Sequence, residues 1–386
     1  MLGSWSIERI REYVWHLVHM PFVPEFRVAD RLAPFPLPFA PSPTDVREWK
    51  VEIDPTGTKL STPLPDNGTL RVGLHRILIE TGIALTPATS SWDPRSWFAL
   101  YRYGSDFAGT EPSLRFYGGV TDKDPRHSAV AAEEVATGVT CYLLREHFGL
   151  DHIADVFPCI QRGELEYVDP DSEVRPDYFC EDASGLTVIA ESKGTVGTRS
   201  DITRQIEPKG WSQVQNVRPT RQPLRQTCSR VVLGTHVCIA GIHPKSETTT
   251  LIKDPDGERP EVADDDADEL LRVAYAKAFR FMQQDAFAER LLFHQELPNI
   301  DEEERLPSSN GIPFLPLSKS PFGDLVGLYG PTLKSLFANS NRSLRASVMR
   351  SLVGFRRQRL ELSGRGYALP NGVIVLHDVD AVDWRM

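Results

Sequence analysis

The chain has 386 residues, of which 40% are hydrophobic and 25% charged, as in an ordinary globular protein with room for two or three domains. Its net charge of −10 argues against a general nucleic-acid coat protein. The five cysteines are scattered, odd in number and form no C-x-x-C pair, which favours neither a disulfide framework nor a zinc cage and suits a reducing cytoplasm.

The N-terminal segment and the hydropathy predict neither export nor a membrane span. Charged residues stand at positions 8, 9, 11 and 12, where a signal peptide needs an apolar run. No stretch approaches 18 uncharged apolar residues. We therefore expect a cytoplasmic protein without a membrane partner.

Residues 1–105 are expected to form an N-terminal accessory region. Apolar positions at helical spacing predict a helix over residues 4–19, and five prolines within residues 34–43 predict an extended connector. Residues 46–103 mix short strand-like runs with turn signals, and no function is assigned to them.

Residues 106–253 carry the pattern of an α/β core, a mixed sheet flanked by helices. The order helix, strand, strand, helix, strand is read from these segments: a helix from Ser128 to about Phe148, a short connector to Ile153–Ile160, two strands joined by a turn at Ala183-Ser184-Gly185, a helical pattern over Ile202–Val217 interrupted at Pro208, and a buried strand within Arg230–Ile242.

Residues 254–386 are expected to form a helical C-terminal accessory region. The pattern predicts one long amphipathic helix over Asp264–Leu297, a loop over Pro298–Ser320 and one or two helices within residues 331–360. The Asn371-Gly372 dipeptide predicts a closing hairpin.

The predicted hairpin in the core region brings two acids and a lysine together. Asp177 and Glu191 each lie seven residues from Ser184, so folding back at the turn sets them almost opposite each other. Glu191 and Lys193 are two apart on one strand, so their side chains share a face. The chain contains four Pro-Asp dipeptides and three E-x-K triplets, but only this combination falls on adjacent strands.

This arrangement resembles the motif of the PD-(D/E)XK, or restriction-endonuclease-like, nuclease superfamily over about residues 127–243. The resemblance implies a metal-dependent endonuclease in which Asp177, Glu191 and the backbone carbonyl of Ser192 hold Mg²⁺ or Mn²⁺. Lys193 would orient or help to deprotonate the attacking water. The resemblance also implies a nucleic-acid substrate, with DNA favoured, and suits a prokaryotic antiviral defence effector that works with an activating protein partner.

The same family often adds a Glu from the helix before the hairpin and a Gln from the helix after it. Glu133 and Glu134 are the candidates for the first, and their helical projection does not decide between them. Gln213 is the candidate for the second, where it could contact the scissile phosphate or the nucleophile. A solvated position is the other reading for each of these side chains.

Basic residues are concentrated just after the motif. From Gly194 to Thr250 the chain has eight of them and only three acids, at Asp201, Glu207 and Glu247. A locally basic face of this kind would attract the phosphates of a nucleic acid. Ordinary solvent-exposed charges would give the same sequence pattern.

Two alternatives to a nuclease remain open at this point. In the first, the Asp–Glu–Lys set is a structural ion pair in a catalytically silent module that binds nucleic acid or a partner protein. In the second, the chain is an assembly or regulatory subunit. A homodimer fits the nuclease reading because cutting both strands often takes two sites, but no residue demands it.

Overall fold

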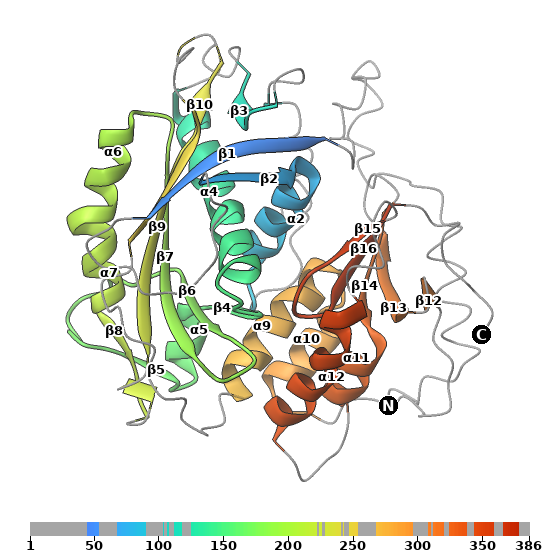
Figure 1. The fold of residues 1–386 in the computed structure, drawn as a ribbon. Coiled ribbons are helices and arrows are strands. Elements are labelled where there is room, and N and C mark those ends of the chain that lie inside the picture. The colour runs from blue at the N-terminus through green and yellow to red at the C-terminus, as the bar shows by residue number, and fades with distance from the viewer. Residues whose placement is uncertain are drawn as a thin grey trace, which may run out of the picture. The chain divides into compact units, whose positions relative to one another are not determined.

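A seven-stranded mixed sheet in the order β2-β1-β11-β9-β7-β6-β4 forms the core of the described chain (Figure 1). β7 runs parallel to β9 and β1 parallel to β11, and the other neighbours are antiparallel. The strands are β1 (Val46–Ile53), β2 (Thr69–Gly73), β4 (His152–Asp155), β6 (Tyr178–Glu181), β7 (Thr187–Thr195), β9 (Ser229–His236) and β11 (Thr249–Lys253). The prediction of an α/β protein with a mixed sheet flanked by helices is therefore confirmed.

The computed structural model describes residues 45–53, 68–89, 103, 106–107, 112–117, 125–221, 224–225, 228–240, 242, 247–253, 268–295, 308–309, 312–319, 324–337, 343–358 and 366–377. The helix predicted over residues 4–19 and the connector predicted over residues 34–43 lie outside these ranges. Within them, no helix combines the length and the apolar character needed to cross a bilayer.

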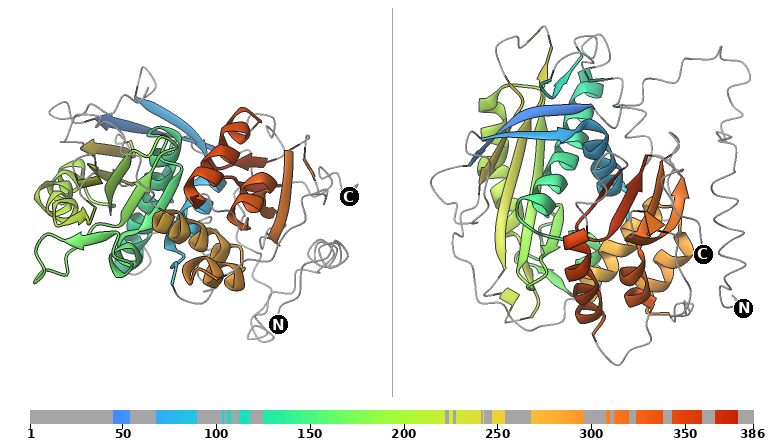
Figure 2. Two further views of the ribbon diagram at one scale, coloured as in Figure 1. Left: turned by 90° about the horizontal axis from the view of Figure 1, so that it is seen from below. Right: turned by 45° about the vertical axis from the view of Figure 1, so that its right-hand side comes forward.

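Helices cover β7 and β9 on both faces, which explains the continuous apolar runs of these strands (Figures 1 and 2). One face packs against α4 (Pro125–Glu146), itself backed by α2 (Leu74–Leu85). A Cβ on Gly194 of β7 would lie 2.6 Å from the Glu133 Cα, so only glycine permits this close approach. The predicted helix over 128–148 is confirmed, and its apolar face, with Val135 and Val139, is buried.

The opposite face is covered by a broken helix made of α6 (Arg199–Arg204), η3 (Gln205–Gly210) and α7 (Trp211–Gln215). Thr198 and Asp201 form a reciprocal capping box that starts α6. Pro208 lies where the helix kinks, since it offers no N–H to the preceding turn. The predicted interruption of the Ile202–Val217 pattern is thus confirmed.

The β6–β7 hairpin turns at Gly185, which has a φ of +92° that favours glycine. The Asp182 carboxylate accepts hydrogen bonds from the backbone N–H groups of Ser184 and Leu186, at 2.7 and 2.9 Å. The register pairs Tyr178 with Ala190. The turn and the pairing agree with the sequence prediction.

The chain divides into two compact units in a way that differs from the expected accessory regions. Elements from β1 to β11 belong to one unit and those from α10 to β16 to the other, and the boundary falls at Ala274–Tyr275 within α9 (Asp268–Phe281). β1, β2 and α2 are therefore part of the core rather than of an accessory region. The pairing of Val51 with Thr250 shows why this was missed, because strand partners so far apart leave no local signal.

Two small ladders lie outside the central sheet in the same unit. They join β3 (Arg115–Phe116) to β10 (Cys238–Ile239), and β5 (Leu165–Tyr167) to β8 (Val217–Pro219). The short helix α5 (Val156–Gln161) follows β4 directly, so the predicted segment Ile153–Ile160 is part strand and part helix.

The second unit contains an antiparallel sheet in the order β12-β13-β14-β16-β15. Its elements are α10 (Asp285–Leu292), β12 (Ser308–Ser309), β13 (Ile312–Lys319), β14 (Leu325–Tyr329), α11 (Gly330–Phe337), α12 (Leu344–Gln358), β15 (Gly366–Ala368) and β16 (Val373–Leu376).

Two predictions for this unit are wrong and two are confirmed. The single helix over 264–297 is two helices, because Gln283 adopts a left-handed φ of 61° that ends α9. The predicted loop over 298–320 contains β13. The two helices within 331–360 and the hairpin at Gly372, with φ +89°, are as predicted.

Candidate active site at the β6–β7 hairpin

Asp177 and Glu191 lie side by side where β6 begins. Asp177 directly precedes β6, and extending the register from Tyr178 and Ala190 by one residue sets it opposite Glu191. The backbone N–H of Asp177 donates to Glu191 Oε2 at 2.9 Å. The structure thus brings together the two carboxylates that the turn spacing placed opposite each other.

Ser192 contacts Asp177 through its backbone and α4 through its side chain. Its N–H donates to Asp177 Oδ2 at 2.9 Å, while its hydroxyl lies 2.9 Å from Thr140 Oγ1 on α4. One more step of the register would set Pro176 opposite Ser192, and proline has no N–H to offer the Ser192 carbonyl. In a strand the N–H and C=O of one residue point to the same edge, so this carbonyl is directed toward the segment that leads into β6 and has no N–H from Pro176 to accept.

Lys193 completes the set by forming an ion pair with Glu191 Oε1. Glu191 is only 1% exposed and the Lys193 side chain 15%. The broken helix covers them, since a Cβ on Gly210 would lie 3.7 Å from Glu191 Cγ. Alternation along β7 holds as predicted: Glu191 faces the broken helix, and Ser192 faces α4.

The surroundings of Glu191 disfavour its charge. Burial, followed by the neighbouring negative charge of Asp177, raises the pKa of Glu191 to about 8, although Lys193 and the Asp177 N–H oppose this rise. When ionised, the carboxylates of Asp177 and Glu191 carry two negative charges, and Lys193 balances only one of them. A bound cation would balance the other.

The donor set fits a hard divalent cation. Asp177, Glu191 and the Ser192 carbonyl offer oxygen only, which suits Mg²⁺ or Mn²⁺ better than zinc. Among the described residues, no third Asp, Glu, His or Cys forms a cluster with Asp177 and Glu191. Water and a substrate phosphate would have to complete the coordination.

The structure does not join Glu133 and Glu134 to this set. Both lie on α4, and the Glu133 backbone packs on Gly194, which faces the side of β7 opposite to Glu191 and Lys193. Glu133 is exposed, and Glu134 accepts a hydrogen bond from the Tyr103 hydroxyl.

Gln213 lies on α7 and holds the segment that leads into Asp177. Its Nε2 donates to the carbonyl of Arg175 at 3.0 Å. Its Oε1 is buried and has no hydrogen-bond partner among the described residues. An acceptor is therefore available close to the hairpin.

Five arginines of the basic stretch after the motif form ion pairs, four of them with acids from other segments, which reduces the unbalanced positive charge of the expected basic face. The ion pairs are Arg199 with Glu52, Arg204 with Asp201, Arg218 and Arg225 with Glu166, and Arg221 with Glu164. Glu52, Glu164 and Glu166 precede the stretch in sequence, so the local charge count could not include them.

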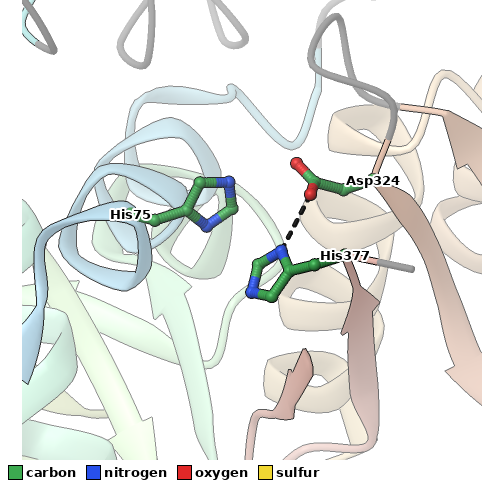
Figure 3. Close-up of side chains that lie close together, drawn as sticks. All are labelled: His75, Asp324 and His377. Atoms are coloured by element: carbon green, nitrogen blue, oxygen red, sulfur yellow. Dashed lines mark hydrogen bonds and ion pairs between the residues drawn. The ribbon is translucent and has the colours of Figure 1, made fainter. Parts of the chain in front are cut away.

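One further pair of polar side chains was missed at the sequence level. His377 Nδ1 lies 2.8 Å from Asp324 Oδ1 in the second unit (Figure 3). The two residues extend the register of β14 and β16, which pairs Leu325 with Leu376. The signal that could have found them is therefore the pairing of these strands, which depends on contacts distant in sequence.

Comparisons with protein-family models, with curated proteins and with solved structures gave no match to this chain.

Proposed function

We propose that this protein is a metal-dependent nuclease that hydrolyses phosphodiester bonds in nucleic acid with a PD-(D/E)XK-type site. The observation that carries the proposal is the reciprocal contact of Asp177 and Glu191 across the hairpin, with Lys193 on the buried Glu191. The order α4, β6, β7, broken helix and β9 around this site agrees with the order on which the resemblance rests. DNA is the favoured substrate by analogy with the family, and a role in defence, an activating partner and a homodimer are expectations of the same kind.

Each residue of the site has a separate proposed role in hydrolysis that follows from its position. Asp177, Glu191 and the Ser192 carbonyl would hold the metal ion, which activates water and offsets charge on the phosphate when it is bound. Lys193 would hold that water and donate to a phosphate oxygen, and its ion pair with the carboxylate of Glu191 supports this role. Gln213 Oε1 could accept a hydrogen bond from the same water and so help to orient it.

The test compares cutting by the wild type with that by Glu191→Ala and Lys193→Ala. Plasmid, linear duplex, single-stranded DNA and RNA are each incubated with Mg²⁺, Mn²⁺ or EDTA. Glu247→Ala is the matched control, since Glu247 is a half-exposed glutamate that pairs with Lys50 away from the hairpin. Metal-dependent cutting that only the hairpin variants lose is the expected result. Equal cutting by all variants would show that Glu191 and Lys193 take no part in catalysis.

A catalytically silent binding module on the same fold is the second candidate. It is favoured by the hydrogen bonding of Glu191, because both of its carboxylate oxygens already accept from donors within the protein, the Asp177 N–H and Lys193. Binding of nucleic acid by the wild type without cutting under any of the metal conditions would support this function instead.

A further inference from the structure

Arg175 differs from the five paired arginines of the basic stretch because its contacts among the described residues include no carboxylate. Its guanidinium carbon lies 4.6 Å from the centroid of the Phe157 ring, and the side chain is exposed. Phe157 itself is 43% exposed. This stacked cation therefore keeps its charge available, whereas Arg199 and Arg218 are paired with acids.

Hydrogen bonds fix this pair next to the candidate active site. The N–H of Val156, the residue before Phe157, donates to the Asp177 carbonyl at 3.0 Å. From α7, the Gln213 side chain donates to the carbonyl of Arg175, two residues before Asp177. Asn216, which follows α7, donates to the carbonyl of Val174 at 2.6 Å. Both halves of the stack are thus anchored to the backbone that carries Asp177.

The chemistry of such a pair suits an unpaired nucleobase. A guanidinium plane stacks on aromatic rings and on bases alike, and its edge N–H groups can also donate to phosphate. Base–aromatic stacking tolerates any sequence, since every base has a π face. In a duplex these faces are covered by neighbouring bases, so a stacking surface selects single strands or unpaired ends. Val174, 51% exposed, adds apolar surface beside Arg175.

We propose that Phe157 and Arg175 form a stacking platform that holds an unpaired base of single-stranded nucleic acid beside Asp177 and Glu191. The assignment of this strand as a substrate rests on the proposed nuclease function, but the binding itself does not. The platform makes a single strand, or the unpaired end of a duplex, the preferred form of the ligand.

Binding is measured by fluorescence anisotropy with a labelled single strand of roughly 16 nucleotides and with the same sequence as a duplex. The full-length wild type is used in EDTA and the Glu191→Ala protein in Mg²⁺, so that no cutting interferes. Phe157→Ala and Arg175→Ala should each weaken single-strand binding about tenfold and duplex binding less than about twofold. Arg175→Lys should lose nearly as much as Arg175→Ala, since an ammonium keeps the charge without the plane. Phe157→Tyr should bind like the wild type.

Arg199→Ala is the control, because Arg199 is an exposed arginine already paired with Glu52. Four results would each overturn the platform. Two concern the alanine variants, Phe157→Ala and Arg175→Ala: binding that stays unchanged, or affinity losses that are equal for the single strand and the duplex. The other two are wild-type affinity in Arg175→Lys, and no single-strand binding by either the wild type in EDTA or Glu191→Ala in Mg²⁺. Single-strand binding that depends on these residues, in a protein that cuts nothing, would uphold the platform and defeat the nuclease proposal. Cutting at the wild-type rate by both Phe157→Ala and Arg175→Ala would uphold the nuclease proposal and defeat the platform.

Discussion

The backbone N–H of Asp177 donates to the buried carboxylate of Glu191 across the β6–β7 hairpin, at 2.9 Å. The same hairpin returns a bond from the Ser192 N–H to the Asp177 carboxylate. Each acid is therefore held by the backbone next to the other, so both carboxylates stay in place without a bound ion. This relationship leads to three predictions beyond the tests above.

The first prediction concerns the stability of the metal-free protein as a function of pH. The pKa of Glu191 is raised from an ordinary 4.5 to about 8, so the folded protein holds this proton more tightly than the unfolded chain does. The stability that the proton contributes is full below pH 4.5 and is lost as the pH rises through about 8. Each tenfold difference in proton affinity is worth about 1.4 kcal/mol.

Thermal unfolding of the wild type in EDTA should show a Tm that falls between about pH 5 and pH 8 and then levels off. Glu191→Gln, which carries no titrating proton, should show a smaller fall over the same range. Mg²⁺ should raise the Tm of the wild type most at the alkaline end, where Glu191 is ionised, and should not raise that of Glu191→Gln. Parallel curves for the two proteins would contradict the position of Glu191 in the site.

The second prediction concerns the Ser192 carbonyl as a metal ligand. Pro176→Ala restores an N–H opposite this carbonyl, and a hydrogen bond worth about 1 kcal/mol would compete with the metal. The Mg²⁺ concentration for half-maximal cutting should rise roughly fivefold. A titration of the cutting rate with Mg²⁺ measures this, and circular dichroism checks that the fold is retained.

Ser192→Ala is the matched control for this experiment. It keeps the carbonyl and removes the hydroxyl that contacts Thr140 on the opposite face of β7. The unfolding free energy should fall by about 1 kcal/mol, while the Mg²⁺ requirement stays unchanged. An unaltered Mg²⁺ requirement in Pro176→Ala would argue against a role for the carbonyl.

The third prediction concerns the two glutamates of α4. Because Glu133 packs by Gly194 on the face away from Lys193, and Glu134 contacts Tyr103, neither should serve the chemistry. Glu133→Gln and Glu134→Gln should keep initial cutting rates within about threefold of the wild type, whereas Glu191→Gln should lose cutting. A large loss in either α4 variant would show that α4 supplies a ligand in the presence of metal.

The sequence by itself determined the hairpin and the facing of its acids. The turn at Gly185 and the alternation along β7 involve contacts within about fifteen residues, so local backbone geometry specifies them. For the same reason the helix α4, the break at Pro208 and the closing turn at Gly372 were readable. In each case one residue type or one periodicity is enough to select the local conformation.

Only the tertiary structure decided which segments meet. β1 joins the core by pairing with β11, and Glu52, Glu164 and Glu166 neutralise arginines that look unpaired along the chain. It also set α4 behind Ser192, away from Glu191, and left Arg175 on Phe157 as a cation without an acid among the described residues. These outcomes depend on packing between residues distant in sequence, for which hydrophobic pattern and charge counts carry no partner information.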